Sequence, residues 1–171
     1  TGVKEEIYVE DQMYGKALAE PLSALIVALS KEFSHVVAAA TAIGKNTLPR
    51  VAALLDVMIL SDIIGIISED TFERPIYAGN ALQTVQSDDS LKVCTIRTAG
   101  FQAAGREGAA KIKKISVKES SSLSSWVEDM VQDSDRPELT SAKVIVSGGR
   151  GVGSEEDFSI IEKLADKLGA A

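Results

Sequence analysis

The chain is poor in the residues on which catalytic and metal sites are usually built. Its 171 residues include one cysteine, Cys94, and one histidine, His35. A single cysteine excludes an internal disulfide and is typical of a reducing compartment. A single histidine excludes any metal site that needs two imidazoles, and it leaves Ser147 without a nearby base. We expect His35 to be structural, and we expect no nucleophilic catalysis through Ser147 or Cys94.

Long apolar runs and excess positive charge are also lacking. The longest apolar stretch, residues 51–67, is interrupted by Asp56, Ser61 and Asp62 and falls short of the roughly 20 residues that a membrane span needs. The net charge of −7 opposes binding to nucleic acid or to an anionic membrane. We therefore predict no nucleic-acid partner and no membrane insertion. The chain opens with Thr1-Gly2-Val3, without an initiator methionine or a targeting segment, so we expect a fragment of a longer protein.

The first third of the chain alternates short apolar runs with helical patterns. Residues 6–10 and 35–40 have the length of strands. Between them, Pro21 suits the first turn of a helix whose apolar face has a spacing of 3.6 residues and consists of Leu22, Leu25, Ile26, Leu29 and Phe33. Residues 41–45 are expected to form a loop, followed by a helix to residue 55 capped by Asn46 or Thr47. This alternation predicts an α/β fold with a parallel sheet covered on both faces.

From residue 57 onward the pattern changes to closely spaced strands. Residues 71–78, 81–86 and 91–97 are separated by turn signals, which predicts an antiparallel hairpin or meander appended to the α/β core. Residues 111–117 suggest one more strand. Serine-rich residues 120–125 suggest a linker or a capping stretch, and Trp126 is expected to anchor it to a surface. We place one domain at 1–133, a linker at 134–142 and the start of a second domain at 143–171.

Residues 144–154, Val-Ile-Val-Ser-Gly-Gly-Arg-Gly-Val-Gly-Ser, predict a strand and a glycine loop that lead into a helix over 155–168. Ser154 and Asp157 form a variant of the capping box, and such a unit aims backbone N–H groups at one point. The run fails the P-loop pattern, because Ser154 stands where lysine is needed, and it also fails G-x-G-x-x-G. A cofactor loop and a plain tight turn therefore both stay open. Arg150, a planar donor, favours the first.

Other candidate sites have plainer interpretations. Residues 42–46 could bind an anion through Lys45, but a helix start with a solvated lysine explains them better. Asp56, Asp62 and Asp70 lack the spacing of a metal site and are interpreted as loop acids.

Five stretches, in order along the chain, resemble the alpha subunit of electron transfer flavoprotein: residues 42–55, 61–63, 74–81, 135–140 and 146–151. The resemblance implies an α/β domain I that packs against a beta subunit, followed by a doubly wound domain II that binds FAD. It implies an electron carrier rather than a bond-making enzyme. The family passes electrons from acyl-CoA dehydrogenases and other dehydrogenases to electron transfer flavoprotein-ubiquinone oxidoreductase, in the bacterial cytoplasm or the mitochondrial matrix.

The resemblance also implies which residues would contact the cofactor. Arg150, with Gly149 beside it, matches the family's flavin-contacting Gly-Gly-Arg-Gly run. The family's Ser-Arg and Gly-Gln-Thr-Gly segments are absent from this sequence, so we expect FAD in the full-length protein and weak or no binding by the chain alone. AMP is expected only in the beta subunit. A scaffold domain for heterodimer assembly and a stand-alone nucleotide-binding α/β domain remain as alternatives.

Overall fold

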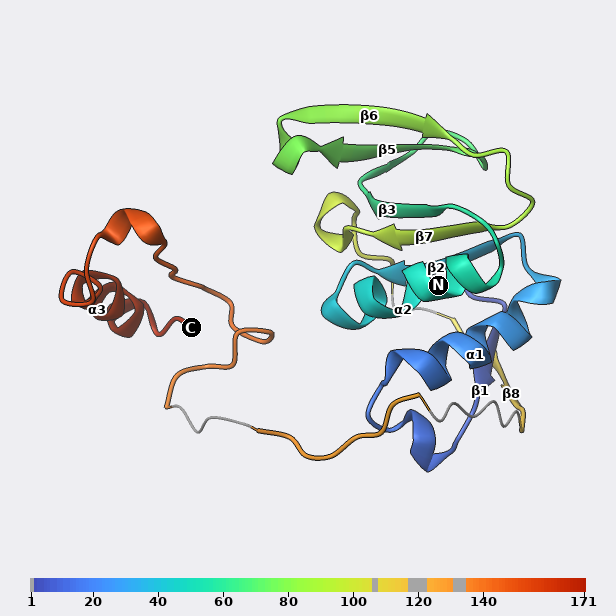
Figure 1. The fold of residues 1–171 in the computed structure, drawn as a ribbon, viewed down its shortest axis with the longest axis horizontal. Helices are drawn as coiled ribbons and strands as arrows, with labels where there is room; N and C mark the ends of the chain where they lie inside the picture. The colour runs from blue at the N-terminus through green and yellow to red at the C-terminus, as the bar shows by residue number, and fades with distance from the viewer. Residues whose placement is uncertain (1, 106–107, 117–122, 131–134) are drawn as a thin grey trace. The chain divides into compact units, whose positions relative to one another are not determined.

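The computed structural model describes residues 2–105, 108–116, 123–130 and 135–171 (Figure 1). The chain divides into two compact units, which we call unit 1 (Thr1–Val127) and unit 2 (Glu128–Ala171). The domain bounds at residues 133 and 143 stay a prediction. Within the described ranges, no helix has the length and apolarity needed to cross a membrane. The same ranges contain no group of acidic, histidine or cysteine side chains that could hold a metal ion.

A three-stranded parallel sheet forms the centre of unit 1. Its strands are β2 (His35–Ala39), β7 (Lys92–Ile96) and β3 (Ile59–Ile63), in the order β2-β7-β3 (Figure 1). The predicted parallel-sheet α/β class is confirmed. The assignment of residues 91–97 to the antiparallel region is wrong, because β7 is the central parallel strand and is buried at three successive residues, Val93, Cys94 and Thr95. A strand covered on both faces needs an unbroken buried run rather than alternation.

Two helices, α1 (Ala19–Leu29) and α2 (Ala42–Leu54), pack together and contribute to the first core. That core contains Leu48, Val51, Ala52 and Val93. Pro21 lies in the first turn of α1, as predicted. The prediction that the apolar face continues to Phe33 is wrong. The Ser30 hydroxyl donates to the Val27 carbonyl at 2.9 Å, the chain tightens into the short helix η2 (Ser30–Glu32), and Phe33 is exposed.

Helix α2 begins earlier than the sequence suggested. Thr41 is its N-cap, and the Thr41 Oγ1 accepts a hydrogen bond from the Gly44 N–H at 3.3 Å. The predicted caps Asn46 and Thr47 lie inside the helix, so that prediction is wrong. A Cβ on Gly44 would lie 2.0 Å from the carbonyl oxygen of Ala39. Glycine is required here because the helix starts directly against the end of β2.

The predicted hairpin is confirmed by a three-stranded antiparallel sheet. Its strands are β4 (Gly65–Ile66), β5 (Thr71–Ile76) and β6 (Ala81–Gln86), in the order β4-β5-β6, and the short helix η3 (Tyr77–Gly79) joins the last two (Figure 1). A second core contains Leu60, Ile63, Phe72 and Cys94, and it joins this sheet to the parallel one.

A β-bulge in β3 makes that second core possible. Leu60 pairs with Cys94 and Ile63 pairs with Ile96, so three steps along β3 match two along β7. Asp62 lies in the bulge with a φ of 62°, and its N–H donates to the Thr95 Oγ1 at 2.8 Å. The extra residue turns both Leu60 and Ile63 to the same side, against the period of two of a regular strand. Asp62 is therefore a bulge residue within a strand, and its interpretation as a loop acid is wrong.

The remaining elements of unit 1 are short. Strands β1 (Glu5–Tyr8) and β8 (Lys111–Lys114) pair in parallel as a separate two-stranded sheet, so the strand predicted around residue 111 is present. Two short helices, η1 (Gln12–Tyr14) and η4 (Thr98–Gly100), lie in connections. Most of the serine-rich stretch lies outside the described residues. Residues 123–127 contain no helix, and the Lys16 ammonium lies 4.3 Å from the ring centroid of Trp126, so Trp126 does anchor this segment.

Unit 2 contains the short helix η5 (Arg150–Val152) and the helix α3 (Ser159–Leu168). The predicted strand at its start is not formed, since residues 144–149 have no regular structure. Two backbone hydrogen bonds flank Ile145: Val146 donates to the Ala171 carbonyl at 2.9 Å, and Ala171 donates to the Val144 carbonyl at 3.1 Å. They form the pattern of a parallel pair, but a strand requires a longer ladder than one residue pair.

Candidate functional site

The glycine loop of unit 2 presents Arg150 on one tight turn. Gly149 is extended, and η5 follows it with hydrogen bonds from the Val152 N–H to the Gly149 carbonyl at 3.0 Å and from the Gly153 N–H to the Arg150 carbonyl at 3.3 Å. Gly153 has a φ of 92°, a conformation that side chains rarely adopt. Arg150 is the first residue of the turn, and its side chain is exposed.

The glycines of the loop have different roles. A Cβ on Gly148 would lie 2.7 Å from the Phe158 Cε2 and 3.0 Å from the Val152 Cγ2, so Gly148 permits close packing of the loop against the following segment. A Cβ on Gly149 or Gly151 would meet nothing within 4 Å. The backbone at these two glycines is therefore open to a ligand. Sequence reasoning missed the role of Gly148, although a glycine before a helix is a known signal of close helix packing.

The Ser154–Asp157 bonds of the predicted capping box form, but they lie in the turns before the helix, whose N-cap is Phe158 without a side-chain cap, so the prediction that Ser154 caps the helix is wrong. The Asp157 N–H donates to the Ser154 Oγ at 3.1 Å, and the Ser154 hydroxyl donates to the Asp157 Oδ2 at 2.8 Å. The predicted start of the helix at residue 155 is wrong. Residues 155–158 form tight turns, in which the Phe158 N–H donates to the Glu155 carbonyl at 3.2 Å, and α3 begins only at Ser159.

A shallow, open groove lies beside the loop. It is lined by Arg150, Gly153, Ser154, Glu155, Phe158 and Glu162. One guanidinium thus shares the groove with two carboxylates, and the partly exposed Phe158 adds an apolar surface. The two carboxylates oppose a multiply charged anion such as a pyrophosphate. An aromatic ring with hydrogen-bond acceptors fits this set of groups better, because arginine can stack on it or donate to it.

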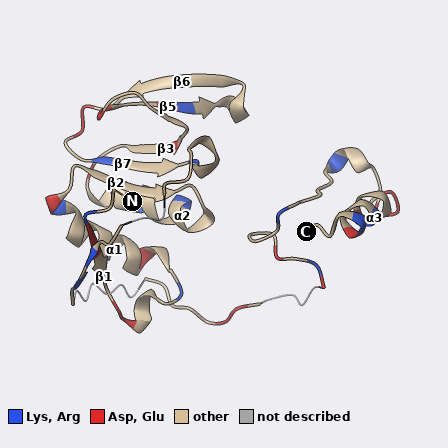
Figure 2. Cartoon of the chain, turned by 180° about the vertical axis from the view of Figure 1, so that it is seen from behind, with Lys and Arg blue, Asp and Glu red and all other residues tan. Residues whose placement is uncertain are grey.

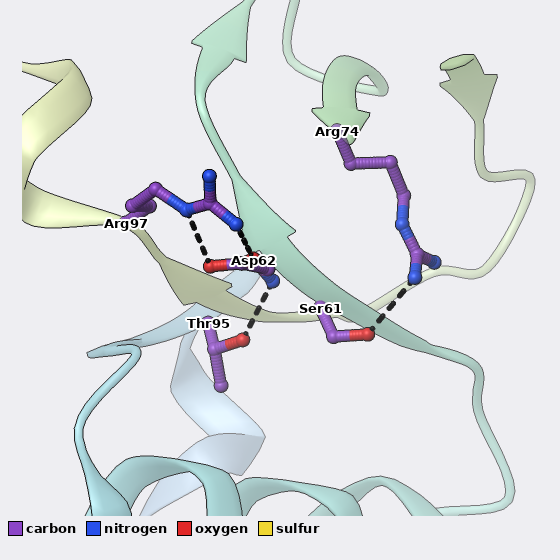
Figure 3. Close-up of polar contacts among 5 residues, drawn as sticks. All are labelled: Ser61, Asp62, Arg74, Thr95 and Arg97. Atoms are coloured by element: carbon purple, nitrogen blue, oxygen red, sulfur yellow. Dashed lines mark hydrogen bonds and ion pairs between the residues drawn. The ribbon is translucent and has the colours of Figure 1, made fainter. Parts of the chain in front are cut away.

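Figure 3 shows a second polar cluster, at the carboxyl ends of β3 and β7. Arg97 binds Asp62 through two hydrogen bonds, one of them from Nε to Oδ1 at 3.1 Å. This contact, aided by the charges of Lys45 and Arg74, lowers the pKa of the Asp62 carboxyl from its ordinary value. Sequence reasoning missed the pair, because no local signal links residues 35 positions apart. The Asp62 carboxylate pairs with Arg97, and the Asp62 N–H forms part of the bulge. We therefore assign this pair a structural role at this end of the sheet.

The sequence candidates Cys94 and His35 both lie in unit 1. Burial raises the pKa of the Cys94 thiol to about 11, which leaves little thiolate for chemistry at neutral pH. His35 has both ring nitrogens engaged, with Nε2 at 2.7 Å from the Glu69 carbonyl oxygen and Nδ1 at 2.9 Å from the Ser34 Oγ. These contacts join the start of β2 to the turn before β5, the structural role expected from the sequence.

Comparison with known proteins gives matches along most of the chain. The family model "Electron transfer flavoprotein domain" matches residues 1–120, and "Electron transfer flavoprotein FAD-binding domain" matches residues 138–171. The chain is 60% identical over 170 residues to the electron transfer flavoprotein subunit alpha of Paracoccus denitrificans, covering 99% of this chain and 55% of that protein. Identity to the Pseudomonas aeruginosa subunit is 50% over 171 residues, covering 99% and 55%.

A mitochondrial relative is also similar. Identity to the electron transfer flavoprotein subunit alpha of Dictyostelium discoideum is 41% over 188 residues, covering 100% of this chain and 53% of that protein. The chain thus spans about half the length of the curated relatives it matches.

Proposed function

The chain belongs to the electron transfer flavoprotein family, as a homologue of its alpha subunit, and from that premise we propose that the protein carries electrons on a bound FAD. The observation that carries the proposal is the position of Arg150. It lies exposed on a tight turn of a segment, residues 138–171, that matches the family's FAD-binding domain.

Arg150 and Gly149 are the residues of this chain that would hold the cofactor. The guanidinium would donate hydrogen bonds and supply positive charge, and the bare backbone at Gly149 leaves room for close approach. When bound, FAD supplies the redox chemistry by accepting electrons and passing them on. The protein's contribution is to bind it, orient it and set the charge around it.

The groove favours contact between Arg150 and the flavin ring. Glu155 and Glu162 line the same groove, and their charges would repel the pyrophosphate of the cofactor. An oxidised flavin ring carries no comparable charge, and a reduced ring that becomes anionic would gain a fixed positive partner in Arg150. This arrangement would stabilise the reduced form of the cofactor.

The proposed partners follow from the family. The protein would assemble with the beta subunit, which would carry AMP, and receive electrons from acyl-CoA dehydrogenases. It would deliver them to electron transfer flavoprotein-ubiquinone oxidoreductase. The relatives named above include bacterial proteins and one that is named as mitochondrial. We therefore propose both the bacterial cytoplasm and the mitochondrial matrix as locations.

The test compares flavin binding in two variants of the full-length protein assembled with its beta subunit. We expect Arg150→Ala to weaken FAD binding about tenfold, the loss of one charge-assisted hydrogen bond of roughly 1.5 kcal/mol, and to lower the flavin reduction potential. Lys163→Ala is the matched control, because Lys163 is an exposed cation on α3 that does not line the groove. Unchanged affinity and potential in Arg150→Ala would overturn the assignment of Arg150.

A second measurement concerns the 171 residues expressed alone. Association costs at least roughly 4 kcal/mol in lost translational and rotational freedom, which the contacts at Arg150 and Gly149 cannot offset by themselves. We expect the isolated chain to retain little flavin. Stoichiometric yellow flavin after purification of this chain would contradict that expectation.

A further inference from the structure

The last segment of unit 1, residues 123–127, lies against the start of α1 without being buried. Leu123 is 73% exposed, Trp126 is 46% exposed and Val127 is 80% exposed. Within the segment, Ser124 alone is not exposed, and no helix or strand is formed. Burial of apolar side chains therefore does not explain why the segment stays on unit 1.

Two side-chain contacts link the segment to the start of α1. The Ser124 hydroxyl donates to the Glu20 Oε2 at 2.7 Å, across 104 positions of the chain. This hydrogen bond is the largest cause of the lowered pKa of the Glu20 carboxyl. The Lys16 ammonium lies 4.3 Å from the ring centroid of Trp126, within the range of a cation–π contact. A serine and a tryptophan two positions apart thus fix the segment at one place on unit 1.

Both contacts are of a kind that forms and breaks readily. Lys16 and Trp126 are exposed to water, and polar contacts between exposed groups contribute little to stability. An open cavity of about 300 Å³ lies beside the Trp126 ring, with Met13 and Pro21 among its lining residues. The ring is therefore only partly packed against unit 1, so little packing energy opposes its release.

The chain that follows the segment is acidic. Glu128 and Asp129 come directly after Val127 (Figure 2), and Lys16 contacts Trp126 just before them. Attraction between this cation and the acidic residues adds to the contact at low ionic strength, and dissolved salt screens it. The attachment of the segment should therefore weaken as salt is added.

The attachment determines the length of chain that connects unit 1 to unit 2. The Ile115 N–H donates to the Tyr8 carbonyl at 3.0 Å, which holds the chain to unit 1 just after β8. In unit 2, the Arg136 guanidinium donates to the Asp166 Oδ1 at 2.6 Å. A chain from Trp126 to Arg136 spans at most about 35 Å, whereas one from Ile115 to Arg136 spans at most about 75 Å. Release of the segment therefore about doubles the greatest possible span of the connection.

We propose that residues 123–127 form a releasable latch on the start of α1, which limits how far unit 2 can move from unit 1. Lys16 and Glu20 hold the latch through Trp126 and Ser124. Domains joined by a connecting segment move relative to each other unless a large interface prevents it. The inference rests on the proposed function, because residues 138–171 match the family's FAD-binding domain. The latch would then control which electron donors and acceptors the flavin can reach.

A distance measurement tests the proposal on the full-length protein assembled with its beta subunit. Fluorescent labels at the exposed positions Ile43 in unit 1 and Lys163 in unit 2 report the separation by single-molecule energy transfer. In the double variant Ser124→Ala/Trp126→Ala, we expect the distance distribution to extend at least about 10 Å beyond that of the wild type. The released chain supplies up to about 40 Å of extra span.

A matched control keeps both contacts. Ser125→Ala/Trp126→Phe changes the neighbouring exposed serine and retains an aromatic ring for Lys16, so its distance distribution should stay as in the wild type. A nitroxide label at the exposed Val127 reads the latch itself. We expect the label to become more mobile in Ser124→Ala/Trp126→Ala and to remain restricted in the control.

Salt provides a further measurement. Raising the ionic strength from about 0.05 M to about 0.5 M should lengthen the separation in the wild type and leave Ser124→Ala/Trp126→Ala unchanged, because only the wild type has a latch to release. An equal response of both proteins to salt would contradict the proposal.

The remaining outcomes separate a latch from a local anchor and from the proposed function. A mobile label at Val127 with an unchanged distance distribution would reduce the contacts to a local anchor and overturn the proposal. A label that stays restricted in Ser124→Ala/Trp126→Ala would also overturn it, since these contacts would then not hold the segment. Flavin is read independently by absorbance, so a working latch in an assembly that holds no FAD would contradict only the proposed function.

Discussion

Units 1 and 2 each contain a glycine that lies close to a neighbouring segment, Gly44 in the first turn of α2 and Gly148 just before the short helix η5. In unit 1, Gly44 faces the backbone of Ala39 at the end of a strand that is already paired with β7. In unit 2, Gly148 faces the ring of Phe158, and the segment before it pairs only with Ala171. The glycine of unit 1 therefore packs against the backbone of a sheet strand, and the glycine of unit 2 packs against a side chain.

The two units also differ in how much apolar surface they bury. Unit 1 has two cores that cover both faces of the strand β7. In the described part of unit 2, only Ala165 and Ala170 are buried hydrophobic residues, while Ile160, Leu164 and Leu168 remain exposed along one stripe of α3. The comparison shows that an amphipathic helix can be specified locally, whereas its stability depends on a packing partner. We expect substitutions to have larger effects in unit 1.

The largest difference is expected from the same truncation in each unit. Leu48 is 1% exposed in the first core, so Leu48→Ala should lower the free energy of unfolding by about 2–5 kcal/mol through lost burial and a cavity. Leu168→Ala at an exposed position of α3 should change it by less than about 0.5 kcal/mol. Chemical denaturation followed by the fluorescence of Trp126, the single tryptophan, reads unit 1. Equal effects of the two truncations would contradict the comparison.

The next largest difference is expected at the two glycines. In Gly44→Ala the new methyl would collide with a backbone carbonyl that the sheet holds in place, so we expect a loss of about 3 kcal/mol, the upper part of the range for overpacking. In Gly148→Ala it would collide with the ring of Phe158, which can rotate, and the loss should be nearer to 1 kcal/mol. Thermal unfolding of both variants measures the difference. A larger loss of stability in Gly148→Ala than in Gly44→Ala would contradict this expectation, because it would show that the Phe158 ring cannot move aside.

A smaller difference is expected between the side-chain cap of α2 and the Ser154 bond in the turns before α3. Thr41→Ala removes the side-chain cap of α2 and should cost about 1 kcal/mol. Ser154→Ala removes a bond to the Asp157 N–H in the turns that precede α3, so it should cost less than Thr41→Ala and leave the unfolding midpoint of unit 1 unchanged. Far-UV circular dichroism and Trp126 fluorescence, recorded together, separate the two effects. The conservative variants Thr41→Ser and Ser154→Thr are the controls and should retain most of each hydrogen bond.

The smallest effect is expected from pH. Hydrogen bonds from Arg97 lower the pKa of Asp62, and hydrogen bonds from Gln86, Ser68 and Thr71 lower the pKa of Asp70. A lowered pKa in the folded state stabilises the protein above the ordinary carboxyl pKa of about 4, and this stability is lost as the pH falls further. Unit 1 should therefore lose stability below about pH 4, and Asp70→Asn should flatten that decline. If the loss of stability at low pH is as steep in Asp62→Asn and in Asp70→Asn as in the wild type, these two carboxylates are not its cause.

Several features of the fold could be predicted from the sequence because their signals are local. Neighbouring residues alone predict three of them: the apolar run of β2, the hairpin of β5 and β6, and Pro21 in the first turn of α1. The hydrogen bonds between Ser154 and Asp157 are equally local, as is the glycine loop that carries Arg150. The roles of Arg150 and Gly149 in binding FAD remain predictions, because they depend on a cofactor.

Other features could not be predicted because they depend on contacts between distant segments. Whether β7 pairs in parallel or antiparallel fashion depends on the strands that flank it. The bulge at Asp62 depends on a match between Ile63 and Ile96, and the start of α2 depends on how closely the helix approaches Ala39.

The sequence by itself determined the composition of the elements, the family and the position of the glycine loop, because periodicity, capping and turn residues act over a few positions. The tertiary structure alone decided that β7 is central, that Asp62 turns the strand, and that the edge of β6 is left open. These features arise from hydrogen bonds and packing between segments far apart in the chain, and no local pattern records them.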